Sequence, residues 1–132
     1  MAPTHDTPRT PLVLVIDDDR VIRMVVREAL EGSGLRVVEA EDENSALEQA
    51  RTHEPDVTIL DIMLPRVDGL TMLSALVEAS GGSQVLVFSA TGSRNAERAL
   101  ELGAADYMSK PFELHDLVER VRQLLSRGRT AA

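Results

Sequence analysis

An alternation of apolar and amphipathic segments predicts an α/β fold: a single doubly wound parallel sheet of five strands with helices on both faces. Five short aliphatic segments recur along the 132-residue chain. Three are almost purely aliphatic, as expected for strands that are covered on both faces. Segments with apolar residues at helical spacing separate them. Because alternating strands and helices form parallel sheets with right-handed crossovers, we expect the strand order 2-1-3-4-5.

The predicted elements follow from these patterns in chain order. The strands are Leu12–Ile16, Arg36–Ala40, Asp56–Leu60, Gln84–Ser89 and Asp106–Ser109. The predicted core positions of the five helices are Val21, Ile22, Val25, Ala29 and Leu30; Ala46, Leu47 and Ala50; Leu70, Leu73, Leu76 and Val77; Ala96, Ala99 and Leu100; and Leu114, Leu117, Val118, Val121, Leu124 and Leu125. Gly32 or Gly34 suits the end of the first helix, and the turn Asp68–Gly69 opens the third. The fifth helix is the most clearly amphipathic.

Length and composition bound the class of protein. We expect one domain over residues 11–126, preceded by a disordered leader (residues 1–10) and followed by a short tail (residues 127–132). The net charge is −8 and only three residues are aromatic, which argues against direct nucleic-acid binding. The chain has no cysteine, no apolar run long enough for a membrane span and no secretory signal, so a cytoplasmic protein is expected.

Polar residues fall where four of the predicted strands end. Asp17 and Asp18 follow the first strand, Asp61 the third, Ser89 ends the fourth, and the fifth runs into Lys110. In open α/β sheets, ligands bind beyond the carboxyl ends of the strands. We therefore expect three carboxylates, a hydroxyl and an ammonium to meet at one edge of the sheet.

The residue types at this edge indicate phosphoryl chemistry on a metal. Clustered carboxylates suit Mg²⁺, which binds a few carboxylates together with phosphate oxygens. One carboxylate would remain available to attack phosphorus, while Lys110 and the Ser89 hydroxyl would hold the phosphoryl oxygens. Lys110 is the single lysine among fourteen cationic residues, as expected where only a compact ammonium fits.

Each residue also has a purely structural interpretation. Asp17, Asp18 and Asp19 could cap the first helix and favour its dipole, an interpretation that fits Asp19 well. Asp61 could cap a loop, and Ser89 and Lys110 could be ordinary strand-end and surface residues. These interpretations are adequate one at a time, but they do not explain why all of these residues fall at the ends of four strands.

Four stretches of this chain resemble the receiver domain of two-component response regulators. They are "VLVIDDDR" (13–20), "DVTILDIMLPRVDGL" (56–70), "VLVFSAT" (85–91) and "GAADYMSKPF" (103–112). The resemblance implies that Asp61 is the phosphoacceptor. It also implies that Asp17, Asp18, Asp61 and the backbone carbonyl of Met63 hold Mg²⁺, and that Lys110 contacts the phosphoryl group before a cis Lys110–Pro111 peptide.

The same resemblance implies a switch and its partners. The phosphoryl group would come from the phosphohistidine of a sensor histidine kinase or a phosphotransfer protein. Ser89 would move towards it, Tyr107 would follow, and the face formed by the fourth helix, fifth strand and fifth helix would change shape. That face would act on a downstream protein or a fused output domain, with homodimerisation as a further option. Such a protein is not an enzyme beyond its own phosphorylation and slow self-dephosphorylation, and it is either a stand-alone receiver or part of a longer regulator.

Other functions fit the residues less well. A haloacid-dehalogenase-type phosphatase would use Asp17, Asp19 and Val21 as its opening motif. It would give Asp61 no role, and this chain lacks the acidic motif that such phosphatases need after the lysine. A flavodoxin-like FMN binder would need a phosphate-binding loop where this chain is acidic. A receiver that has lost phosphorylation and serves as a scaffold is a third alternative, although every required side chain is present.

The resemblance also assigns the lifetime of the phosphoryl group to two positions, Met63 and Thr91. Since Met63 cannot orient an attacking water, we predict slow self-dephosphorylation that Met63→Asn accelerates. The loss of labelled phosphate from the two proteins measures this, and an unchanged decay rate would contradict it.

Overall fold

The computed structural model describes residues 10–62, 68–89 and 93–128, and the side chains within them except those of residues 89 and 93–96. Residues 1–9 of the predicted leader and 129–132 of the predicted tail lie outside this description. The elements are β1 (Leu12–Ile16), α1 (Arg20–Gly32), β2 (Arg36–Ala40), α2 (Glu43–His53), β3 (Val57–Asp61), α3 (Gly69–Ser80), β4 (Gln84–Ser89), α4 (Ser93–Glu101), β5 (Asp106–Ser109) and α5 (Leu114–Arg127). Among the described residues, no helix is both long and apolar enough to span a bilayer.

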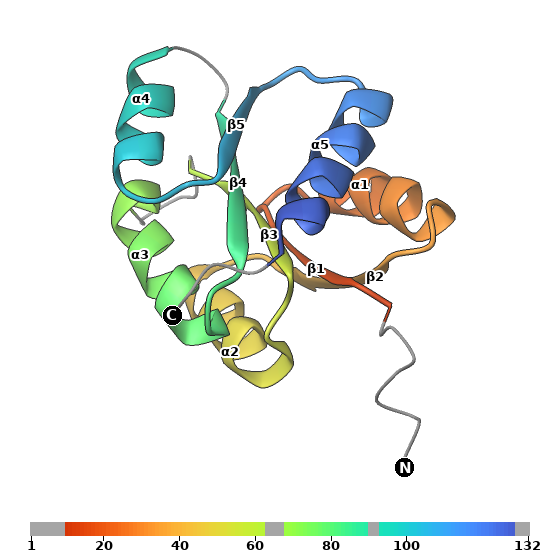
Figure 1. Ribbon diagram of the computed structural model, residues 1–132, viewed down its shortest axis with the longest axis horizontal. Helices are drawn as coiled ribbons and strands as arrows, with labels where there is room; N and C mark the ends of the chain where they lie inside the picture. The colour runs from red at the N-terminus through yellow and green to blue at the C-terminus, as the bar shows by residue number, and fades with distance from the viewer. Residues whose placement is uncertain (1–9, 63–67, 90–92, 129–132) are drawn as a thin grey trace.

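The five strands form one parallel sheet in the order β2-β1-β3-β4-β5, which confirms the predicted fold class (Figure 1). β3 lies one residue later than predicted. Asp56 precedes it, and its backbone N–H donates to the Leu12 carbonyl while its carboxylate accepts from the Leu12 N–H at 2.9 Å. Asp61 is consequently the last residue of β3, paired with Phe88 of β4.

Alternate residues of each strand face two separate layers of helices. α1 and α5 cover one face of the sheet, and α2, α3 and α4 cover the other (Figure 1). Val13 and Val15 of β1 pack towards α1 and α5, whereas Leu14 and Ile16 pack towards α2 and α3. All five residues of β1 and of β3 are buried. This arrangement keeps the central strands dry and leaves their carboxyl ends as the place where polar groups emerge.

The predicted core face of α1 is wrong in part. Val26 and Leu30 are buried, but Val21 is 61% exposed and Val25 is 36% exposed. The side chain of Asp19 caps α1 and fixes where the helix begins. The helix then presents the stripe Ile22, Val26 and Leu30 to the sheet. Both stripes are apolar in sequence, so helical periodicity could not choose between them.

Two further predicted core residues are exposed. Leu100 of α4 is 49% exposed, because α4 packs on the sheet through the neighbouring Ala99. Leu114 is 37% exposed, since it is the first residue of α5 and lies one turn before the buried Leu117. The other predicted helical core residues with described side chains are buried or partly buried. Ala96 lies outside the described side chains.

Gly69 at the start of α3 is required by a close backbone approach. Asp68 caps this helix, with its carboxylate accepting from the Leu70 N–H at 3.0 Å. A methyl carbon at Gly69 would lie 2.5 Å from Cα and 2.6 Å from the carbonyl oxygen of Ile62. Because these are backbone atoms, they cannot move aside as a flexible side chain would, and α3 would be displaced from the end of β3.

We predict that Gly69→Ala lowers the free energy of unfolding by about 1–3 kcal/mol, the usual cost of overpacking. Gly32→Ala is the matched control, because Gly32 is also helical and has nothing within 4 Å of its missing methyl group. It should be neutral or stabilising by about 0.4–1 kcal/mol. Urea unfolding measures both, and equal stabilities for the two variants would contradict the prediction.

Candidate functional site

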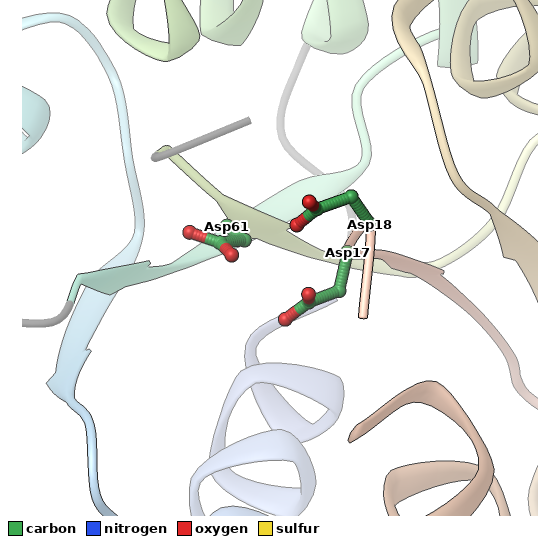
Figure 2. A group of neighbouring side chains, drawn as sticks. All are labelled: Asp17, Asp18 and Asp61. Carbon is green, nitrogen blue, oxygen red and sulfur yellow. The ribbon is translucent and has the colours of Figure 1, made fainter. Parts of the chain in front are cut away.

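The carboxyl ends of β1 and β3 bring three aspartates together. β1 and β3 are neighbours, with Ile16 paired to Leu60, so Asp17 and Asp61 leave the sheet side by side. One carboxylate oxygen from each of Asp17, Asp18 and Asp61 lies within 4.8 Å of the others (Figure 2). The predicted convergence of these three residues is confirmed.

Lys110, the residue that follows β5, joins this group. Its Nζ lies 2.8 Å from Asp17 Oδ2 and 3.0 Å from Asp61 Oδ2. One ammonium therefore bonds to carboxylates from two strands. The Lys110–Pro111 peptide is cis, as predicted. The segment is anchored beyond it by Phe112, whose ring lies 4.6 Å from that of the buried Phe88 on β4.

Burial and the hydrogen bonds between Lys110 and the carboxylates have opposite effects on the pKa values of Asp17 and Lys110. Asp17 is 1% exposed. Burial raises the pKa of its carboxyl above the ordinary 3.8, and the charge of Asp61 adds to the rise, although Lys110 and the Asp19 amide donate hydrogen bonds that lower it. At Lys110, burial lowers the pKa, but the hydrogen bonds to Asp17 and Asp61 outweigh it and raise the pKa above the ordinary 10.5. The site thus favours a charged ammonium and disfavours the charge on Asp17.

Asp19 serves the helix and stays outside the acidic group. Its Oδ1 accepts from the backbone N–H groups of Val21 at 2.9 Å and Ile22 at 3.3 Å. Its own N–H donates to Asp17 Oδ1 at 2.9 Å. The third aspartate of the sequence motif is therefore the N-cap of α1, and it orients the first aspartate through its backbone.

The donor set fits a small divalent cation. Three carboxylates against one ammonium leave two negative charges uncompensated when all four groups are ionised. Asp17 and Asp61 are buried whereas Asp18 is exposed, so the group is open to solvent on the Asp18 side. Carboxylate oxygens are ligands of Mg²⁺, which retains waters and takes phosphate oxygens as further ligands. Asp17, Asp18 and Asp61 are the residues that would hold it.

The remaining predicted site residues are only partly described. Ser89 ends β4 opposite Ser109 of β5, but its side chain lies outside the described residues, as do Met63 and Thr91 entirely. Tyr107 lies on β5 and is half-buried, with its hydroxyl 2.9 Å from Ser109 Oγ. The side chain of Arg120 on α5 donates to the Tyr107 carbonyl at 3.0 Å and pairs with Asp106 at 3.1 Å. The Tyr107 side chain packs with the apolar layer that includes Ala99 of α4, while its backbone carbonyl is bound from α5.

One contact at the site was not predicted from the sequence. Arg23 Nη1 donates to the backbone carbonyl oxygen of Asp17 at 2.6 Å. Helical side chains point back towards the N-terminus of their helix, so an arginine one turn after the Asp19 cap can reach the segment before it. That spacing is the signal that the sequence contained.

Comparisons with known proteins agree with this geometry. The family model of the response regulator receiver domain matches residues 13–122. The chain is 40% identical over 116 residues to the response regulator MprA of Mycolicibacterium vanbaalenii, which covers 87% of this chain and 50% of MprA. It is 39% identical to the KDP operon transcriptional regulatory protein KdpE of Escherichia coli, with 87% of this chain and 51% of KdpE covered.

A solved structure shows the same fold. The receiver domain of the Francisella response regulator 1452 superposes with a TM-score of 0.82 at 34% identity, covering 89% of this chain and 98% of that one. The chain spans about half the length of MprA and KdpE. With its strand order, acidic group and family match taken together, this chain belongs to the response regulator receiver domain family.

Proposed function

We propose that Asp61 accepts a phosphoryl group from the phosphohistidine of a sensor histidine kinase or a phosphotransfer protein, in a Mg²⁺-dependent reaction. The observation that carries this proposal is the shared ammonium. Lys110 Nζ donates to both Asp17 and Asp61 while Asp18 completes the acidic group. An anionic phosphoryl group could approach three carboxylates only where positive charge compensates them.

Each described residue has a role in this reaction. A carboxylate oxygen of Asp61 forms the bond to phosphorus as the bond between phosphorus and the donor nitrogen breaks. Lys110 neutralises the phosphoryl oxygens and holds them in position. Asp17 and Asp18 hold the metal, which when bound neutralises the developing charge on those oxygens. The chain is then a signalling protein, with no catalysis beyond its own phosphorylation and slow self-dephosphorylation.

The output follows from added charge. An aspartyl phosphate carries about −1.5 to −2 charges where one carboxylate stood. Ser89 would be drawn to the new oxygens, and Tyr107, which contacts Ser109 and is held through its carbonyl by Arg120, would move with it. The face formed by α4, β5 and α5 would then bind a downstream protein, a fused output domain or a second copy. We expect the protein to act in the cytoplasm.

The phosphatase alternative is weakened by the role of Asp19. That alternative needs the second aspartate of an Asp-x-Asp motif in the reaction, yet Asp19 caps α1 through the Val21 and Ile22 amides. It also gives no role to Asp61, which lies in the acidic group. The same three carboxylates would repel the phosphate of FMN.

We predict that acetyl phosphate and Mg²⁺ add one group of about 80 Da, the mass of a phosphoryl group, as seen by intact-protein mass spectrometry. Asp61→Asn should abolish the gain, since the nucleophile is lost, and so should chelation of the metal. Asp19→Asn is the matched control, because asparagine also caps helices well and labelling should persist. Steady release of phosphate from simple phosphomonoesters, dependent on Asp19, would instead support the phosphatase.

A second prediction concerns pH, metal and stability. The raised pKa of Asp17 means that the folded protein binds more protons than the unfolded chain between pH 3.8 and that raised pKa. Without metal, this group therefore makes stability fall as pH rises through the window. Mg²⁺ takes the place of the proton, so its stabilising effect should grow through the same window, reaching about 2.7 kcal/mol at a hundred times its Kd. Lys110 does not contribute here, because its stabilisation is lost only as pH rises through its own raised pKa, above 10.5.

Urea unfolding with and without Mg²⁺, from pH 3.8 up to neutral pH, measures this effect. Asp18→Asn is the control, because Asp18 is exposed and its loss removes a ligand without leaving a new buried group unpaired. Its stability should no longer respond to Mg²⁺. If Mg²⁺ stabilises the wild type by the same amount at both ends of the pH range, the prediction is contradicted.

A further inference from the structure

The guanidinium of Arg23 joins the aspartate segment to the edge strand. It donates through Nη1 to the Asp17 carbonyl at 2.6 Å and through Nε to Glu39 Oε1 at 3.0 Å. The Arg23 side chain is 12% exposed. Glu39 lies on β2 at the edge of the sheet, and none of the three aspartates of the acidic group comes from this strand. A planar group with several fixed donors can make both bonds at once, whereas an ammonium cannot reproduce that geometry.

The bond to the Asp17 carbonyl constrains Asp18. The carbonyl of Asp17 and the N–H of Asp18 belong to one rigid peptide plane. Asp17 is fixed on the other side by its N–H, which donates to the Ala40 carbonyl at 3.2 Å, and by its carboxylate. Asp18 is exposed, and among the described residues none donates to its carboxylate. The Asp17–Asp18 peptide therefore sets the direction of the backbone from which the Asp18 carboxylate extends.

Arg23 is itself held in position by a chain of charges. The second oxygen of Glu39 accepts from Arg27 Nη1 at 2.7 Å, and Arg27 Nε lies 3.1 Å from Glu31 Oε2. Burial acts to raise the pKa of Glu39, but the bonds from Arg27 and Arg23 outweigh it and lower the pKa. Glu39 thus remains an anion to which Arg23 can bond.

We propose that Arg23 is a positioning residue for the metal site. It holds the Asp17–Asp18 peptide so that the exposed Asp18 carboxylate faces Asp17 and Asp61, and Glu39 holds Arg23. The inference rests on the proposed role of these aspartates in binding Mg²⁺. Arg23 touches neither the metal nor the phosphoryl group in this scheme, and it acts through the backbone of Asp17.

Arg23 could affect Mg²⁺ binding through its charge or by positioning Asp18, and these two explanations predict opposite changes in Mg²⁺ affinity when Arg23 is removed. Arg23 is a fixed cation bonded to the backbone of the aspartate segment, so removing it should strengthen Mg²⁺ binding if only its charge matters. If Arg23 positions Asp18, its removal should weaken binding. Outer residues that orient metal ligands typically contribute 10–100-fold to metal affinity.

The test is a Mg²⁺ titration followed by backbone amide shifts in NMR spectra of four proteins: wild type, Arg23→Met, Arg23→Lys and Arg27→Met. We expect a Kd about tenfold weaker for Arg23→Met, a smaller loss for Arg23→Lys, and a nearly unchanged Kd for Arg27→Met. Arg27 is the matched control, because it lies on the same helix and bonds to the same Glu39 but does not reach Asp17. In Arg23→Met, Glu39 still has Arg27 as a cationic partner. If Arg23→Met does not fold, the comparison of Arg23→Lys with wild type provides the test.

The outcomes separate this inference from the function on which it rests. Equal or tighter Mg²⁺ binding by folded Arg23→Met or Arg23→Lys overturns the positioning role and leaves the proposed function intact. An equal loss in Arg27→Met also overturns it, because the effect would then come from the charge network as a whole. A wild type that does not bind Mg²⁺ overturns the metal-dependent function, and the inference with it.

Discussion

The ammonium of Lys110 is the group that lets two buried carboxylates exist side by side. Asp17 is 1% exposed and Asp61 is 4% exposed, and carboxylates removed from water at such short range would otherwise lose their charge or unfold the site. Lys110 bonds to both. It cannot neutralise both, and the carboxylate of Asp18 adds to the excess. The structure therefore holds a small surplus of negative charge at a fixed place, which is the physical basis for attracting a divalent cation.

Carboxylates that repel one another stay close together only if the backbone that carries them is rigid, and the parallel sheet provides that rigidity. The residues that precede the site, Val15 and Ile16 of β1 and Ile59 and Leu60 of β3, are buried in two separate apolar layers. Lys110 is anchored by the residues that follow it, where Phe112 packs on Phe88 within the apolar layer that also holds Val15 and Ile59. The site is thus fixed by strands that cannot slide without disrupting both cores. Parallel strands place all of these anchors at one edge because their carboxyl ends share it.

The sequence predicted the strands, their order and the meeting of Asp17, Asp18, Asp61 and Lys110, because each depends on which residue follows an apolar run. The exposed stripe of α1 could not be predicted in this way. The helix has two apolar stripes, one with Val21 and Val25 and one with Ile22 and Val26. Only the Asp19 cap and the packing of the helix on the sheet determine which stripe is buried.

Contacts between distant side chains were also beyond the sequence. Nothing in the pattern pairs Arg23 with Glu39, sixteen residues away, or with the Asp17 carbonyl. Those contacts depend on the distance and rotation between α1 and β2, which tertiary packing sets. Asp19 is the contrasting case, because its role is local: its position just before a helix favoured a cap, and the structure shows the cap.

The burial and crowding of the carboxylates at this site also destabilise the fold, and binding of a cation can relieve that cost. A raised pKa at Asp17 means that its ionised form is disfavoured in the fold. Any cation that binds the ionised group recovers that free energy, and by linkage a ligand favoured by one conformation favours that conformation in return. A site placed between two well-packed cores can carry this cost without unfolding. Under the proposed function, charge added at Asp61 by phosphorylation would act on β4, which pairs with β3 at Asp61, and through it on β5.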